Sequence, residues 1–147
     1  MTMKVLQSQS ESGGHFAIAE FARLQTPAQG AICDTLQAQI DKALPNATCR
    51  IWHGGPVWFI GENPVVGYNV RSGRVNLMFW SGQLFDEPLL RPAGKDKAAV
   101  ISLQDGVATD AVALRRWLRK ARSIQFDYVG TYARKRAAAR GTRSAIG

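Results

Sequence analysis

The centre of the chain places turn residues at such short intervals that only antiparallel strands can connect them. From Thr48 onward, side chains alternate with a period of two, and the alternation is interrupted at Gly54-Gly55-Pro56, Gly61–Pro64 and Arg71–Gly73. A parallel crossover needs about a dozen residues or more, which none of these interruptions supplies. The segment therefore predicts an antiparallel sheet of consecutive hairpins.

Helical patterns precede and follow these strands. The pattern predicts about five strands, at Cys49–His53, Val57–Ile60, Val65–Val70, Arg74–Trp80 and Lys97–Leu103. Helices are expected at His15–Leu24, from the Thr26-Pro27 start signal to about Leu44, and from a cap at Thr109 or Asp110 to about Arg122. The order favours an α+β fold, with one antiparallel sheet and N- and C-terminal helices packed on one face.

The chain length fits one domain of ordinary size. With 147 residues, 46% of them hydrophobic, the chain can bury a core but has no room for a second full domain. We expect a flexible leader over residues 1–14, a domain over 15–130 and a basic tail over 131–147. Neither a secretory signal nor a membrane span is evident, and Cys33 and Cys49 form no disulfide framework, so a cytoplasmic protein with free thiols is expected.

Alternation along two strands separates an apolar face from a mixed one. The face expected to meet the helices carries Val66, Tyr68, Val70, Val75, Leu77 and Phe79. The opposite face carries Val65, Gly67, Asn69, Asn76, Met78 and Trp80, with Trp52 or Trp58 as further candidates. We favour the interpretation that the loop from Gly82 to Pro92 folds over this mixed face as a second small core. The alternative is an open surface for a small molecule or for a second copy of the chain.

Positive charge gathers at the C-terminal end. Residues 115–147 hold ten basic residues and one acidic residue, a net charge of +9, whereas residues 1–114 hold nine basic and ten acidic residues, a net charge of −1. We interpret the excess as a solvated helix face followed by a frayed end. Weak binding of nucleic acid or another polyanion is the alternative, through Arg115, Arg116, Arg119, Lys120, Arg134, Lys135 and Arg136.

No constellation of catalytic residues is visible, so we predict a protein that is not an enzyme and has no cofactor. The chain lacks phosphate-loop and dinucleotide motifs, and it has only two histidines. Cys49 and His53 are four residues apart, about 13 Å along a strand, which is too far for one metal ion. The carboxylates that remain as a weak candidate metal set are Asp86, Glu87 and Asp96.

Three segments carry a recognisable set of motifs: Ile51–Trp58 resembles a W-G-x-P-x-[FYW] pattern, Val75–Gly82 a strand running into a glycine, and Leu89–Lys97 an L-L-x-G-x-G-K loop. With these motifs, roughly residues 15–125 resemble the YdhG-like domain-of-unknown-function family. The helices at Thr26-Pro27 and at residues 109–122 resemble its opening and closing helices. The resemblance implies a compact α+β domain, frataxin-like in layout, and it names no catalytic residue.

Two classes of function remain open beside the polyanion alternative. The first is a non-enzymatic binding or adaptor domain for an unknown small molecule or protein, acting as a monomer or homodimer. Its expected site residues are Trp52, His53, Trp58, Asn69, Asn76, Trp80 and Lys95. The second, implied by frataxin-like relatives of the family, is an iron chaperone that would use Asp86, Glu87 and Asp96. The scattered carboxylates and the basic closing helix favour the first.

Overall fold

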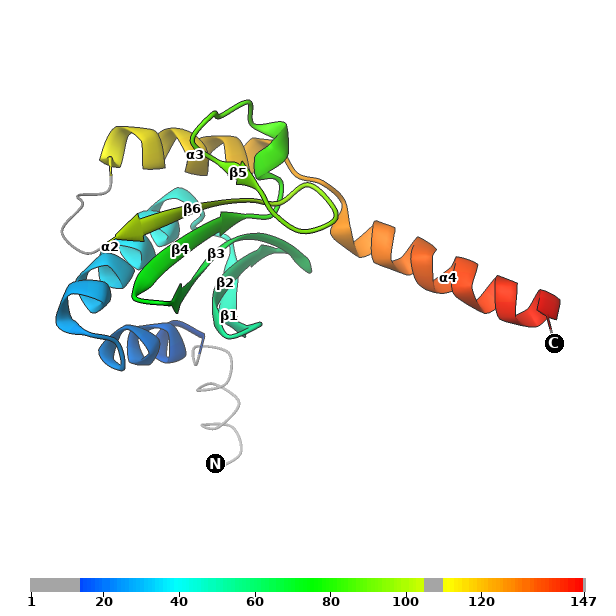
Figure 1. Cartoon of the computed structure of the whole chain (residues 1–147), viewed down its shortest axis with the longest axis horizontal. Helices are drawn as coiled ribbons and strands as arrows, with labels where there is room; N and C mark the ends of the chain where they lie inside the picture. Colours follow the sequence, from blue (N-terminus) through cyan, green and yellow to red (C-terminus); the bar gives the residue numbers. More distant parts are fainter. Residues whose placement is uncertain (1–13, 105–109, 147) are drawn as a thin grey trace.

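A computed structural model of the chain describes residues 14–104 and 110–146 (Figure 1). It contains one antiparallel sheet of six strands in the order β1-β2-β3-β4-β6-β5, which confirms the predicted α+β fold. The strands are β1 (Thr48–Trp52), β2 (Gly55–Ile60), β3 (Asn63–Arg71), β4 (Arg74–Phe79), β5 (Arg91–Pro92) and β6 (Ala99–Gln104). The short β5 is the strand that the sequence pattern does not predict.

Two tight turns with positive φ close the β1–β2 and β3–β4 hairpins. His53 and Gly54 join β1 to β2 with φ of 52° and 85°, and Ser72 and Gly73 join β3 to β4 with φ of 53° and 73°. Positive φ at both central residues is the mark of a type I′ turn, whose twist matches that of the flanking strands. The first of these turns places Trp52 and His53 at the tip of a hairpin.

The helices begin where capping chemistry predicts. In α2 (Pro27–Ala43), the Thr26 hydroxyl accepts a hydrogen bond from the Gln29 backbone N–H at 3.2 Å. In α3 (Ala111–Ser123), Asp110 is the cap, while Thr109 lies outside the described residues. An N-terminal helix covers residues 14–23.

The expected leader, residues 1–14, includes one residue that belongs to the domain. Gly14 is helical and buried, and a Cβ there would lie 2.0 Å from the Cys49 carbonyl oxygen. Gly14 therefore packs against β1 as part of the domain. Residues 1–13, the rest of the expected leader, lie outside the described residues.

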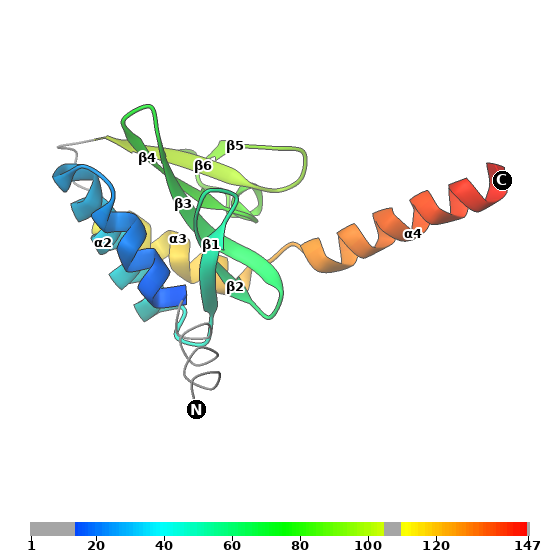
Figure 2. The same ribbon diagram turned by 90° about the horizontal axis from the view of Figure 1, so that it is seen from below.

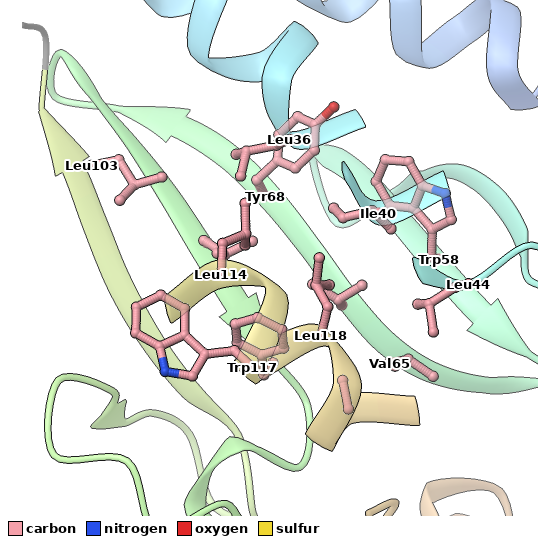
Figure 3. Packing of buried hydrophobic residues seen from close by; sticks show 14 of the residues in the cluster. Leu36, Ile40, Leu44, Trp58, Val65, Tyr68, Leu103, Leu114, Trp117 and Leu118 are labelled. Atoms are coloured by element: carbon pink, nitrogen blue, oxygen red, sulfur yellow. The ribbon is translucent and has the colours of Figure 1, made fainter. Parts of the chain in front are cut away.

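The N-terminal helix, α2 and α3 all lie on one face of the sheet (Figure 2). The core between them contains the predicted inward-facing residues of β3 and β4, together with Leu36, Ile40, Leu114 and Leu118 (Figure 3). Trp58 is also in this core, and its indole Nε1 donates a hydrogen bond to Asp41 at 2.8 Å. The expectation that Trp58 could join the opposite, mixed face is therefore wrong.

Val65 also points into the core, although strict alternation assigns it to the mixed face. Trp58 pairs with Val66 but Phe59 pairs with Pro64, so β3 carries one extra residue at Val65. Such a β-bulge re-aims a side chain. Val65 is consequently 3% exposed and packs beneath the helices.

The loop after β4 does not fold over the mixed face, contrary to the interpretation we favoured. Its short 3-10 turn η1 (Gly82–Leu84) leads to Phe85, which packs against Phe79 and joins the core together with Leu90. The loop therefore packs on the helix side of the sheet, and the mixed face is left without this cover.

A nearly buried carboxylate fixes that loop to α3. Glu87, whose side chain is 7% exposed, accepts two hydrogen bonds from the Arg116 guanidinium at 2.9 Å, one from the Lys120 ammonium at 2.6 Å and one from the Trp117 indole at 2.9 Å. These bonds, above all those from Arg116 and then Lys120, hold the pKa of the Glu87 carboxyl well below its ordinary value.

The C-terminal segment is a helix, α4 (Tyr128–Ile146), that projects from the body of the domain (Figure 1). Its first turn is anchored, because the Tyr128 hydroxyl donates to the Trp80 carbonyl and accepts from the Lys97 backbone N–H. The expected frayed end is therefore helical, and the expected boundary at residue 130 falls inside α4. No helix within the described ranges is long and apolar enough to cross a bilayer.

Replacing Glu87 by Gln is expected to lower the free energy of unfolding by about 2 to 3 kcal/mol at pH 7, because charge-assisted hydrogen bonds are lost. The folded-state pKa lies below the ordinary value of 4.5. The carboxylate therefore stabilises the fold above that pH and loses its effect as the pH falls toward the folded pKa. Urea unfolding of the wild type and of Glu87→Gln between pH 7 and pH 3 measures the difference.

The matched control is Glu20→Gln, which breaks the partly exposed Glu20–Arg23 ion pair at 3.3 Å. Such a pair contributes less than about 1 kcal/mol. A difference between wild type and Glu87→Gln that stays constant down to pH 3 would contradict the assigned role of the Glu87 carboxylate.

Candidate functional site

The mixed face of the sheet is left uncovered by the helices and loops of residues 14–104 and 110–146 (Figure 2), and we call it the uncovered face. It contains a small pocket beside the β1–β2 turn. Its cavity volume is about 90 Å³. The lining residues are Trp52, His53, Gly55, Val57, Gly67, Tyr68, Asn69, Asn76, Met78, Trp80 and Val100. Five residues that the sequence singles out for ligand binding thus come together here: Trp52, His53, Asn69, Asn76 and Trp80.

The pocket exists because the sheet curls. Trp52 ends β1 and Trp80 follows β4, and in a flat sheet three strand spacings would separate these strands by about 14 Å. The ring centroids of Trp52 and Trp80 are nevertheless 6.0 Å apart, with the rings stacked at an interplanar angle of 30°. The edge strand β1 therefore curls back over the centre of the sheet.

Two glycines permit this approach. A Cβ on Gly67 would lie 2.5 Å from the Pro56 carbonyl oxygen, and a Cβ on Gly55 would lie 2.1 Å from the Tyr68 carbonyl oxygen. No real side chain tolerates such distances to backbone atoms. The bare backbone at Gly55 and Gly67 thus allows β2 and β3 to bend toward each other and forms part of the pocket lining.

Aromatic rings form one wall of the pocket. The Trp52 indole lies 4.1 Å from the His53 ring, 5.4 Å from the Phe59 ring and 6.0 Å from the Trp80 ring, measured between centroids. The Arg50 guanidinium covers the Phe59 ring at 4.2 Å. Trp52 is therefore held on several sides, which makes the wall stiff before any ligand arrives.

Polar side chains form a ladder across the neighbouring strands. Asn69 on β3 is the register partner of Asn76 on β4, which is in turn the partner of Ser102 on β6. The Ser102 hydroxyl donates to the Asn76 carbonyl oxygen at 2.7 Å, and the Asn76 amide donates to the Asn69 carbonyl oxygen at 3.0 Å. Among the described residues nothing accepts from the Asn69 amide nitrogen, so its two N–H groups remain available in the pocket.

Lys95 does not belong to this pocket. It lies in the exposed turn between β5 and β6 and is not one of the lining residues. Trp58, the other outlier of the predicted set, lies in the core on the opposite side of the sheet. Lys95 and Trp58 are predicted as binding residues because glycines and aromatic residues lie near them in the sequence. Such neighbours do not determine on which face of a curled sheet a side chain lies.

Ser102 is the functional candidate that sequence reasoning misses. A single serine in a strand gives no sequence signal for a binding role. Only the register between β4 and β6, which places Ser102 opposite Asn76, identifies it. That register depends on a connection of about twenty residues and is not set by a tight turn.

The three candidate metal ligands are not brought together. Glu87 is held by Arg116 and Lys120, and Asp96 lies 3.6 Å from the Lys135 ammonium. Over residues 14–104 and 110–146, no group of three or more His, Cys, Asp or Glu side chains is arranged to hold a metal ion. The set Asp86, Glu87 and Asp96 is therefore wrong as one site.

The predicted polyanion-binding residues fall into three separate places. Arg116 and Lys120 bind Glu87, whereas Arg115 and Arg119 line a groove between α2 and α3. The remaining members, Arg134, Lys135 and Arg136, are exposed on α4. The basic residues that the sequence groups as one polyanion-binding set therefore do not form one surface.

Comparison of the chain with protein-family models, with curated proteins and with solved structures gave no match. The resemblance to the YdhG-like family therefore stays a prediction. The candidate site rests on its own geometry.

Replacing Gly67 by Ala is expected to separate the Trp52 and Trp80 rings, because the new methyl group meets the Pro56 carbonyl and forces β2 and β3 apart. The free energy of unfolding should fall by about 1 to 3 kcal/mol, as in other overpacked sites. The loss of the near-ultraviolet circular dichroism signal of the stacked indoles measures the separation, and Trp52→Phe calibrates that signal.

Gly73→Ala is the control on the same pair of strands. A Cβ there meets nothing within 4 Å, but the φ of 73° is unfavourable for alanine, so stability should fall by about 1 to 2 kcal/mol. Its near-ultraviolet signal should stay intact. An unchanged signal in Gly67→Ala as well would show that Gly67 does not control the curl.

Proposed function

We propose that this chain is a non-enzymatic binding domain of the YdhG-like type, and that the uncovered face of its sheet takes a small molecule. The proposed ligand has a planar apolar part and a neighbouring hydrogen-bond acceptor. The observation that carries the proposal is the position of the Asn69 amide donors in the same pocket as the Trp52 and Trp80 rings.

The apolar part of the ligand follows from the aromatic wall. Flat rings stack on indoles in offset or edge-on arrangements, and Met78 adds a polarizable thioether to the same lining. A closed cavity of about 150 Å³ accommodates benzene. The pocket is smaller, at about 90 Å³, but Trp80 and Met78 are partly exposed, so a ligand can extend outward past them.

The polar part of the ligand follows from the direction of the ladder. Because the carbonyl oxygens of Asn69 and Asn76 already accept hydrogen bonds, the pocket presents amide donors. Donors select a carbonyl, carboxylate or ring-nitrogen acceptor. A buried donor left without a partner costs about 1 to 3 kcal/mol, which discriminates against ligands that have no acceptor at that point.

The absence of paired titratable groups supports binding over catalysis. His53 is the one imidazole among the lining side chains. General acid–base chemistry usually takes a positioned partner for such a group, and none of the lining residues is an aspartate, glutamate, lysine or cysteine.

Benzamide is a suitable probe because it joins a planar ring to a carbonyl acceptor. We expect saturable binding to the full chain with a dissociation constant of about 1 mM, equivalent to a binding free energy of about −4 kcal/mol. Tryptophan fluorescence and protein-observed NMR measure the binding. Trp80→Ala and Asn69→Leu should each weaken it about tenfold. Benzylamine, which replaces the acceptor by an ammonium group, should bind at least tenfold more weakly than benzamide.

Asn46→Ala serves as the control, because Asn46 is an exposed residue in the turn before β1. It should bind benzamide as the wild type does. The proposal fails if benzamide does not saturate the wild type, or if Trp80→Ala and Asn69→Leu both bind it unchanged.

A further inference from the structure

We infer that the groove between α2 and α3 is a second binding site, and that its ligand carries two closely spaced phosphate groups. The groove has a cavity volume of about 270 Å³. It is lined by Gln39, Lys42, Ala43, Arg115, Leu118, Arg119 and Arg122. Four of these seven residues are cationic and none is acidic.

Helix geometry brings the cations together. Arg115, Arg119 and Arg122 are spaced by four and three residues on α3, so they share one face at intervals of about 6 and 4.5 Å along the helix axis. Lys42 comes from the last turn of α2, which packs beside α3 (Figure 2). The side chain of Leu118, fully buried between these residues, forms the floor.

These four cations differ from the other basic residues of α3. Arg116 and Lys120, on the neighbouring face of the same helix, are both bound to Glu87. Within the described part of the chain, Lys42, Arg115, Arg119 and Arg122 make no ion pair. The like charges repel one another, and an anion in the groove relieves that repulsion.

Charge balance indicates the size of the anion. Lys42 and Arg122 lie in the last turns of α2 and α3, where each helix dipole contributes about −0.5 charge. Four cations and two helix ends leave a net charge of about +3. One carboxylate leaves most of that charge uncompensated, whereas two phosphate groups, at about −1.5 to −2 each, match it. Arginine also binds phosphate oxygens in a bidentate manner.

This inference is independent of the function proposed above. The groove is lined by residues of α2 and α3, and these helices lie on one face of the sheet (Figure 2). The pocket that Trp52 and Trp80 line is on the other face. Variants of one site are therefore expected to leave the other unchanged. Failure of the benzamide experiment does not bear on the groove.

Inorganic pyrophosphate, which carries two linked phosphate groups, is the probe. Isothermal titration with the full chain at low ionic strength should show binding with about one site per chain. Arg119→Gln combined with Arg122→Gln should weaken it at least tenfold. Lys42→Gln alone should also weaken it, since the inferred site includes both helices. All of these side chains are exposed, and thermal unfolding verifies that the variants fold.

Arg134→Gln combined with Arg136→Gln is the matched control, because it removes the same charge from exposed positions on α4. It should bind pyrophosphate as the wild type does. Equal weakening by both double variants would mean that only net charge matters and would overturn the site. The inference also fails if pyrophosphate does not bind while a single-stranded oligonucleotide does, since the partner would then be a nucleic acid backbone.

Discussion

The close approach of β2 and β3 at Gly55 and Gly67 is the constraint on which the uncovered face depends. Without a Cβ at these positions the strands bend, and the β1–β2 hairpin then carries Trp52 back toward Trp80. The extra residue at Val65 adds to the bend, because a bulge increases local twist. A flat sheet with the same side chains would have two separate tryptophans and no pocket.

The two faces of the sheet differ because polar contacts hold a tryptophan and a loop on the helix side. Trp58 is buried beneath α2 with its N–H bound to Asp41, and Glu87 fixes the loop after β4 to α3. Both contacts draw aromatic and loop residues toward the helices. The mixed face is consequently left with the Asn69–Asn76–Ser102 ladder and two partly exposed tryptophans, the groups on which the proposed binding function rests.

Electrostatics divides α3 in a comparable way. Arg116 and Lys120 bind the nearly buried Glu87 carboxylate and so fix the loop after β4 to α3. Arg115, Arg119 and Arg122, on the adjacent face, meet Lys42 instead of a carboxylate. Within two turns of α3, one arginine therefore binds a carboxylate of the fold, while the other three line the groove.

The sequence by itself determined the local structure. Thr26-Pro27 and Asp110 specify helix starts, Ser72-Gly73 specifies a hairpin, and period-two alternation assigns Tyr68 and Leu77 to the core and Asn69 and Asn76 to the opposite face. These signals suffice because capping, turns and pleating act between neighbours in the chain.

Only the tertiary structure decided which side Trp58 and Val65 occupy, that Ser102 lies opposite Asn76, and that Lys42 meets the arginines of α3. Curl, bulge and helix packing depend on contacts between distant segments, and no local pattern encodes them.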